Sequence, residues 1–491
     1  MVTDGITDRL AAHVADVANT APSAQDVEVM RRLILDNFVV SLWGATRPAA
    51  GELADWSRRF SGSGSSPILG RDWSTDASIA ALVHGAAAHS YELDDTHNAT
   101  ASHPGSVIIP VALAVAAEPG PPVCRDALFQ ATIAGYEAMT LIGMAAGGMA
   151  AVHRGFHPTS LFGAYGGAVT AIALRALRRG DIVHADDVRR TWGQALSQPS
   201  GSMQFSMEPA GGEIKRVHAG LGAHNGIRSA DFADLPAVTA PQLVIEGEYG
   251  LAASYGGAVV DVPLEGMRQI QRLSLKPYSC CRLFHSTIDA LREVTDGFVL
   301  DPTSIRDILV TGPRLIAEQH MTPARSSMTA QYSCPYILGA TLAYGPTRFD
   351  AYGEEFLADP RIRGIADRVR FEVDARLEAE HYPEHFATGV RLTLADGSER
   401  SAVVVDSVGT EERPLTVEQI VAKAEGLAGA GLEGAGARLR SRLWDDSVDV
   451  AAITGALHAE ALRIPHTPRP TPGDPPDPTI HPKPHTARTK E

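Results

Sequence analysis

The sequence predicts a mainly α protein in which a large all-helical domain, discontinuous along the chain, is joined to a smaller α+β domain. Apolar residues recur at helical spacing through most of the first 270 residues. Near Leu273 short strand-like runs begin to alternate with helices, and a helical pattern returns after Pro414. We therefore expect the helical domain to comprise residues 1–270 and 411–463, with the α+β domain inserted over 271–410 and a tail over 464–491.

The first half of the chain is expected to form one helix after another. A capping box from Ser23 to Asp26 opens one helix, which Gly44 and Pro48 end. Further helices are expected at 76–90, 105–118, 125–146, 159–178 and 185–197. Several of them are rich in Ala and Gly, and small residues at a contact let helix axes approach closely.

The α+β domain is predicted from five strand-like runs with two helices among them. The strands are expected at 272–275, 308–311, 369–373, 389–394 and 400–405, and the helices at 283–295 and 327–343. Asp396-Gly397 is a good hairpin turn between the last two strands. A capping box from Thr416 to Gln419 and a helix at 448–463 follow. The tail is Pro-dense and nearly free of apolar residues, so we expect it to be disordered.

The charge and the N-terminus exclude several classes of protein. With 43 basic and 58 acidic residues the net charge is −15, so nucleic-acid binding is not expected and an anionic substrate would need a local basic pocket. The N-terminus lacks the pattern of a signal peptide, and no apolar run is expected to reach the length of a membrane span. Four cysteines without a CxxC suit a reducing compartment, and we expect a cytoplasmic protein.

The first candidate for chemistry is the acidic, histidine-containing segment at 92–105. Pro104 suits the first turn of the following helix, which places His103 near a helix N-terminus. The positive end of the helix dipole favours a nearby anion and disfavours imidazolium, so this histidine could transfer protons near neutral pH. A polar loop with a capping aspartate remains an alternative, as does a metal site formed by Asp95, His97 and His103.

A second histidine repeats this design, and a lysine follows it. His157 precedes Pro158 at an apparent helix start, and two such histidines suggest imidazoles aimed at one anion-binding space. Lys215 opens another helix among small residues, from which it could reach a carboxylate in a cleft. A structural role for His157 and a solvated basic patch around Lys215 remain open alternatives.

The third candidate lies at the predicted domain boundary. Lys276, Arg282 and His285 provide three potential cations within ten residues, just ahead of a helix. Ligand sites favour domain interfaces, so this segment is interpreted as the second domain's contribution to a carboxylate clamp. Cys281 is interpreted as a buried structural thiol. The absence of GxSxG, GxGxxG and HExxH motifs makes hydrolase, dehydrogenase and zinc-protease functions less favoured.

Five blocks in this order resemble the MmgE/PrpD family, which includes 2-methylcitrate dehydratase, cis-aconitate decarboxylase and iminodisuccinate epimerase. They comprise residues 92–97 with His103-Pro104, 155–158, 215–220, 276–282 with His285, and 332–336. The resemblance implies a helical domain with a smaller α+β lid, a homodimer, no metal and no organic cofactor, and a site between the domains.

The resemblance also assigns residues. It implies that His103, His157, Lys215, Tyr336 and Asp94 are catalytic, and that Lys276, Arg282, His285 and Asp95 bind substrate. Which of the two aspartates faces the substrate is left open. Cys281 stands where some decarboxylases of the family carry histidine, which puts the exact reaction in doubt.

We therefore expect a cofactor-independent lyase, either a dehydratase or a decarboxylase, that acts on a small di- or tricarboxylic acid. Histidines would move the proton, while lysines and helix N-termini would stabilise the developing charge. An epimerase working through a carbanion is the alternative within this chemistry. Rivals from other classes are a metal-dependent hydrolase using Asp95, His97 and His103, and a catalytically inactive protein that binds small acids.

Overall fold

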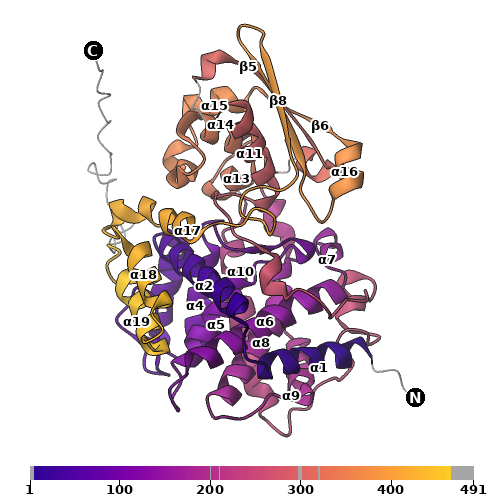
Figure 1. Ribbon diagram of the computed structural model, residues 1–491, viewed down its shortest axis with the longest axis vertical. Coiled ribbons are helices and arrows are strands. Elements are labelled where there is room, and N and C mark those ends of the chain that lie inside the picture. Colours follow the sequence, from indigo (N-terminus) through magenta and orange to yellow (C-terminus); the bar gives the residue numbers. More distant parts are fainter. Residues whose placement is uncertain (1–4, 199–200, 210, 297–300, 319–320, 466–491) are drawn as a thin grey trace.

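The computed structural model describes residues 5–198, 201–209, 211–296, 301–318 and 321–465. It shows a large helical lobe with a smaller lobe above it (Figure 1). The predicted class, mainly α with a smaller α+β portion, is confirmed. The predicted disordered tail lies outside the described residues, apart from Ile464 and Pro465.

The helical lobe is formed by two separate stretches of the chain. The first contributes α1 (Ile6–Asn19), α2 (Ala24–Ala45), α3 (Pro48–Trp56), α4 (Ala77–His89), α5 (Gly105–Ala116), α6 (Arg125–Ala145), α7 (Met149–His153), α8 (Pro158–Leu177), α9 (Ala185–Ala195) and α10 (Ile214–Ala233). The second contributes α17 (Val417–Lys423), α18 (Ala435–Trp444) and α19 (Val450–Ala461), which pack on the flank of the lobe (Figure 1). Both predicted capping boxes, at Ser23 and Thr416, are present.

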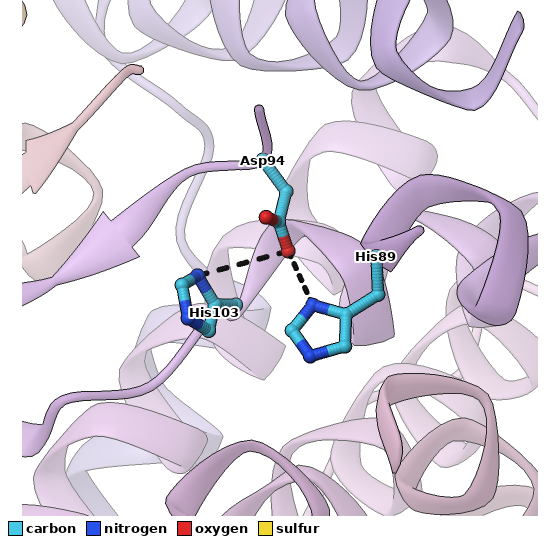
Figure 2. Close-up of side chains that lie close together, drawn as sticks. All are labelled: His89, Asp94 and His103. Atoms are coloured by element: carbon cyan, nitrogen blue, oxygen red, sulfur yellow. Dashed lines mark hydrogen bonds and ion pairs between the residues drawn. The ribbon is translucent and has the colours of Figure 1, made fainter. Parts of the chain in front are cut away.

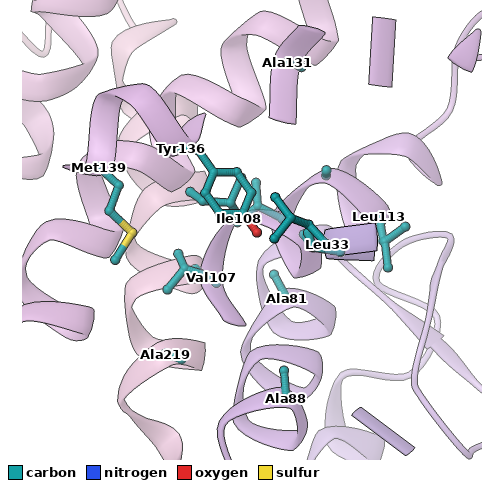
Figure 3. Close-up of a cluster of buried hydrophobic side chains, with 14 of the residues drawn as sticks. Leu33, Ala81, Ala88, Val107, Ile108, Leu113, Ala131, Tyr136, Met139 and Ala219 are labelled. Atoms are coloured by element: carbon teal, nitrogen blue, oxygen red, sulfur yellow. The ribbon is translucent and has the colours of Figure 1, made fainter. Parts of the chain in front are cut away.

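Close packing of α10 between α4 and α8 depends on glycine. A Cβ atom on Gly220 would lie 2.1 Å from the carbonyl oxygen of Leu82, and one on Gly226 would lie 2.8 Å from the backbone of Gly167. Larger side chains would push these helices apart. The close approach brings the start of α10 beside the loop that follows α4, and this loop carries the site. Figure 3 shows part of the apolar core of this lobe, with Val107, Ile108 and Tyr136 among its buried side chains.

The smaller lobe contains a four-stranded sheet covered by helices. Its strands are β5 (Ile305–Gly312), β6 (Val369–Val373), β7 (Thr388–Leu394) and β8 (Glu399–Val404), in the order β6-β5-β7-β8. Its helices are α11 (His285–Val294), α12 (Arg314–Ala317), α13 (Ser327–Tyr332), α14 (Cys334–Tyr344), α15 (Pro360–Ala366) and α16 (Ala375–His381). The predicted hairpin is present, because β7 and β8 pair antiparallel around Gly397 with φ +86°.

Short strands join distant regions of the chain in the helical lobe. They are β1 (Ser66–Pro67), β2 (Ser74–Thr75), β3 (Thr96–His97) and β4 (Leu273–Ser274). β3 pairs antiparallel with β4, so Thr96 lies opposite Ser274, two residues before Lys276. This pairing fixes the chain that leads into the smaller lobe against the loop that follows α4.

Helix α8 passes a test for membrane spans by length and composition alone. The prediction that no apolar run reaches that length was therefore wrong for Pro158–Leu177. In its most apolar 18-residue window, 83% of the residues are buried inside the fold. Its Ala- and Gly-rich sequence is accounted for by packing against α6 and α10.

Candidate active site

The centre of the site is the loop from Ser90 to Pro104, between α4 and α5. Among the described residues, three non-glycine residues have positive φ, and two of them, Glu92 at +56° and Ala101 at +48°, lie in this loop. Such conformations cost about 1–3 kcal/mol each and persist only where surrounding contacts impose them. At Glu92, the contacts of its side chain hold the backbone in this conformation.

Glu92 is buried among three cations. Its Oε1 accepts hydrogen bonds from Lys215 Nζ and, at 2.8 Å, from Arg216 Nη1, while its Oε2 lies 3.3 Å from Lys276 Nζ. Burial alone would raise the pKa of Glu92, but Lys215, Lys276 and Arg216 outweigh it and hold that pKa well below its usual value. These four groups, one carboxylate and three cations, carry a net positive charge, and two of them, Glu92 and Lys276, line the cavity described below.

The two lysines respond differently to this environment. Burial lowers the pKa of Lys215, and the neighbouring Arg216 and Lys276 act in the same direction. Burial opposes the charge of Lys276 too, but Glu92 and Asp94 outweigh it and raise its pKa. Lys276 is therefore the more firmly charged of the two lysines.

Asp94 connects Lys276 to two histidines, and Figure 2 shows its contacts with His89 and His103. Its Oδ2 accepts hydrogen bonds at 2.6 Å from both His89 Nδ1 and Ser106 Oγ, and Lys276 Nζ lies 3.6 Å from its Oδ1. Since the carboxylate can only accept, neutral His89 carries its proton on Nδ1. The Nε2 atom of His89 is buried without a hydrogen-bond partner in the described portion of the chain.

His103 is held in one tautomer. Its Nδ1 lies 2.7 Å from the carbonyl oxygen of Asp95, which can only accept a hydrogen bond, so Nδ1 carries the proton. Its Nε2 therefore offers a lone pair, and it has no hydrogen-bond partner among the described residues. Burial lowers the pKa of His103 to about 3, against the nearby charge of Asp94. His103 is thus a neutral imidazole oriented as a proton acceptor.

His157 lies beside His103 at the start of α8. Both predicted His-Pro pairs stand at helix N-termini, and Thr159 Oγ1 in the first turn of α8 accepts a hydrogen bond of 3.1 Å from the backbone N–H of His103. His157 Nδ1 lies 3.0 Å from His218 Nδ1, so one of these two nitrogens donates to the other. If His218 donates, His157 carries its proton on Nε2 and can act as an acid.

Burial keeps this pair of histidines neutral as well. It lowers the pKa of His157 well below its usual value, helped by Lys215, and lowers the pKa of His218 to about 4. The ring centroid of His89 lies 5.0 Å from that of His103 and 5.7 Å from that of His157. The four active-site histidines, His89, His103, His157 and His218, therefore form one connected group.

A cavity of about 250 Å³ opens between the lobes onto this group. Its lining includes Glu92, His103, His157, Lys276 and Arg282. The structure thus brings together four of the predicted site residues: His103, His157, Lys276 and Arg282. Lys215 lies one contact behind the cavity, through Glu92, and Asp94 lies behind His103 and Lys276.

Arg282, like Lys276, is a cation of the boundary segment that lines the cavity. It donates a hydrogen bond from Nη1 to Ser407 Oγ, while its buried Nε has no partner among the described residues. Burial lowers its pKa to about 10. His285, predicted beside it as a substrate-binding residue, instead turns into the core, where its Nε2 lies 3.3 Å from the Cys280 carbonyl oxygen.

The predicted tyrosine also lies away from the cavity. Tyr336 belongs to the core of the smaller lobe and donates a hydrogen bond of 2.9 Å to the carbonyl oxygen of Ala351. Tyr332, four residues earlier, lines the cavity, and its hydroxyl donates to Glu92 Oε1 at 3.2 Å. Burial and Glu92 raise the pKa of Tyr332 well above its usual value. The geometry therefore offers Tyr332 as the proton-bearing tyrosine.

Asp95 supports the site rather than lining it. Its Oδ1 accepts a hydrogen bond of 2.8 Å from the Gly105 N–H at the start of α5, and its Oδ2 accepts one of 3.1 Å from the Tyr136 hydroxyl. Burial and Asp94 raise its pKa to about 7. Asp95, predicted to bind substrate, therefore lies outside the cavity lining, where its carbonyl holds the His103 tautomer.

The proposed metal ligands Asp95, His97 and His103 do not converge. Both ring nitrogens of His97 are engaged, Nδ1 with Thr100 Oγ1 at 2.9 Å and Nε2 with Gln269 Oε1 at 3.1 Å. Within the described ranges, the group near the cavity with three ligand atoms within 4.8 Å of one another is His89, Asp94 and His103. His89 Nδ1 and Asp94 Oδ2 lie 2.6 Å apart, a hydrogen-bond distance that is shorter than the separation of about 3.3 Å expected between two ligand atoms of a tetrahedral zinc ion.

The sequence did not single out several residues that complete the site. Glu92, His218 and Tyr332 stand inside the blocks described above but received no role, and His89 carries no motif of its own. Lys423, at the end of α17, reaches under the loop, where its Nζ lies 2.5 Å from Asp36 Oδ1 and 3.1 Å from the Leu93 carbonyl oxygen. No local signal could have located Lys423, because 330 residues separate it from Leu93.

Most of the chain matches known proteins. The MmgE/PrpD N-terminal domain matches residues 8–260, and the MmgE/PrpD C-terminal domain matches residues 278–446. Cis-aconitate decarboxylase from Aspergillus terreus is 24% identical over 458 residues, which cover 87% of this chain and 90% of the relative. The human protein of the same name is 24% identical over 416 residues, 81% of this chain and 82% of the relative. A cis-aconitate decarboxylase-like protein, oryM, from Aspergillus oryzae is 25% identical over 448 residues, 85% and 90% of the two chains.

Proposed function

This chain belongs to the MmgE/PrpD family and is a lyase, and from that premise we propose that it removes CO2 or water from a small tricarboxylic acid such as cis-aconitate or citrate. The observation that carries the proposal is that His103 and His157 line one cavity together with Lys276 and Arg282. We place decarboxylation first because the relatives named above carry that activity in their names. The proposed reaction needs neither a metal nor an organic cofactor.

Substrate carboxylates bind to the cations in this proposal. Lys276 and the partly unpartnered guanidinium of Arg282 face the cavity, and the N-termini of α5 and α8 add partial positive charge. A carboxylate that approaches Lys276 competes with Glu92 for its ammonium group. Because these groups lie in a buried site, their attraction for the charge that develops during the reaction is stronger than in water.

The two histidines transfer the proton. In a dehydration, His103 Nε2 takes the proton next to a carboxylate, the C–H electron pair forms the double bond, and the hydroxyl group leaves with a proton from His157 or Tyr332. In a decarboxylation, the bond to the leaving carboxylate breaks and CO2 departs. The electron pair moves through the adjacent double bond to a carbon that His157 or Tyr332 protonates. The dehydration requires one imidazole that accepts a proton and one group that donates one, whereas the decarboxylation requires only the donor.

The test is product analysis with four candidate substrates. The protein is incubated with cis-aconitate, citrate, 2-methylcitrate and iminodisuccinate in D2O and followed by NMR, with and without EDTA. Decarboxylation is expected to give a dicarboxylate with deuterium at the protonated carbon and to be insensitive to EDTA. Loss of activity to EDTA with recovery on adding one divalent metal would favour a hydrolase or another metal enzyme. Deuterium exchange with inversion of iminodisuccinate alone would identify the epimerase alternative, which the same pair of histidines could serve.

We further propose that the protein is a homodimer, as the family resemblance suggests, and that it is located in the cytoplasm, a reducing compartment that suits its cysteines. Light scattering on the purified protein tests the assembly, and a monomer mass at micromolar concentration would contradict it.

A further inference from the structure

The walls of the active cavity differ in chemistry from its floor. The floor carries the charged and titratable groups described above. The walls are largely apolar, and they include Met149, Val152, Met203, Leu315, Met321 and Phe386. A small polycarboxylate bears a charged group on nearly every carbon, so it has little surface that could pack against such walls.

Both lobes contribute to these apolar walls. Met149 and Val152 belong to α7 of the helical lobe, whereas Leu315 lies on α12 of the smaller lobe. Met321 of the smaller lobe packs in one buried cluster with Phe205 of the helical lobe. The rings of Phe205 and His157 make a T-shaped contact with a centroid distance of 5.7 Å and an interplanar angle of 89°. The apolar surface therefore extends from a catalytic imidazole outward between the lobes.

Glu318, a charged residue of the lining, does not make the walls themselves less apolar. Glu318 lies 3.8 Å from Arg314 and is about half exposed, so it belongs to the outer rim. Three of the wall residues are methionines, whose flexible and polarisable side chains adapt to ligands of different shape. Burying one methylene group on such a surface increases affinity about fourfold.

We propose that the substrate is a polycarboxylate with an apolar substituent larger than a methyl group. Its carboxylates bind Lys276 and Arg282 on the floor, and its chain lies along the wall formed by Val152, Met203 and Leu315. The proposal rests on the function proposed above for the substrate head group, but the wall itself can be tested without any turnover.

Binding of unreactive ligands tests the wall directly. Dissociation constants are measured by calorimetry for succinate and for 2-methyl-, 2-propyl- and 2-hexylsuccinate. We expect affinity to rise about fourfold for each of the first few methylene groups and then to level off where the cavity ends. An affinity that stays constant or falls from succinate to hexylsuccinate would overturn the proposal.

Turnover separates this proposal from the proposed function. The corresponding 2-alkyl-cis-aconitates are compared with cis-aconitate by their kcat/KM. A higher kcat/KM for the alkyl compounds supports both proposals. If no compound is converted but affinity still rises with chain length, the lyase assignment fails while the apolar wall stands. If cis-aconitate is the best substrate and affinity is flat, only the apolar-substituent proposal fails.

A charge placed on the wall provides the matched test. Leu315→Glu is compared with Val403→Glu, the same kind of change at an exposed position on β8 of the same lobe, outside the cavity lining. The readout is the ratio of the succinate and hexylsuccinate dissociation constants, so a general loss of anion affinity does not affect it. We expect Leu315→Glu to reduce this ratio at least tenfold and Val403→Glu to preserve it. An unchanged ratio in both Leu315→Glu and Val152→Glu would contradict the proposal.

Discussion

Replacing Glu92 with Gln removes the carboxylate that compensates three buried cations. The Glu92 side chain is 1% exposed, and Lys215, Arg216 and Lys276 all contact it. The amide oxygen can still accept a hydrogen bond, but it carries no charge. The variant therefore leaves a positive cluster that the fold no longer neutralises.

The expected loss of stability follows from the burial of this cluster. Removing one partner of a buried ion pair costs about 3–5 kcal/mol of stability. Asp94 remains 3.6 Å from Lys276 and offsets some of the loss, so we expect a decrease of about 3 kcal/mol. Glu213, which lies 3.7 Å from Arg216 but is 57% exposed, provides the control. Glu213→Gln should cost no more than about 1 kcal/mol.

The same substitution should increase affinity for an anion. Two unit charges about 8 Å apart at an effective dielectric constant near 20 repel each other by about 2 kcal/mol. Loss of this repulsion corresponds to about thirtyfold tighter binding of succinate. Saturating succinate should therefore restore more stability to Glu92→Gln than it adds to the unmodified protein.

Urea unfolding with and without succinate, together with calorimetry, measures both effects. An unliganded Glu92→Gln variant as stable as the unmodified protein would refute the assignment of Glu92 as the compensating anion. Succinate binding no tighter than in the unmodified protein would refute the placement of the substrate carboxylate at this cluster.

Three further predictions concern the surroundings of the cavity. His103→Gln should lower kcat by about 10²–10⁴ with an unchanged circular dichroism spectrum, and a decrease of less than about tenfold in steady-state assays would remove it as the proton acceptor. Lys423→Met should lower both stability and kcat, because it frees the Leu93 carbonyl and leaves Asp36 uncompensated. Adding Asp36→Asn to the Lys423→Met variant should restore the urea midpoint but not kcat. Recovery of both would show that the role of Lys423 is purely structural. The four active-site histidines have lowered pKa values, so the unfolded chain binds protons that the fold does not. Their contribution to the free energy of unfolding is complete above about pH 6.5 and is lost as the pH falls, by up to about 1.4 kcal/mol per histidine and pH unit. A free energy of unfolding that stays constant between pH 7.5 and pH 5 would contradict this prediction.

Local sequence signals predicted the elements that carry the site. Pro104 and Pro158 are best accommodated in the first turn of a helix, so the placement of His103 and His157 at helix N-termini could be read directly from the chain. The capping boxes and the Asp-Gly turn are local in the same sense, since each depends on residues a few positions apart.

One error in the predicted elements changed a site residue. The single helix expected at 327–343 is interrupted at Ser333, which adopts extended backbone angles and caps α14. Pro335 in the first turn of α14 lacks the N–H that a continuous helix would require. The interruption leaves Tyr332 at the cavity and Tyr336 in the core, an outcome that depends on how two helices pack.

The sequence by itself determined the class of fold, the helix starts that orient two imidazoles, and the lysines and arginine available to bind an anion. Only the tertiary structure decided that Glu92 neutralises those cations, that Lys423 supports the loop from 330 residues away, and that His285 and Tyr336 face the core. The physical reason is that capping and turn formation depend on neighbouring residues. Charge compensation and burial depend on which distant segments meet, and here that was set by the glycine contacts of α10 and by the pairing of β3 with β4.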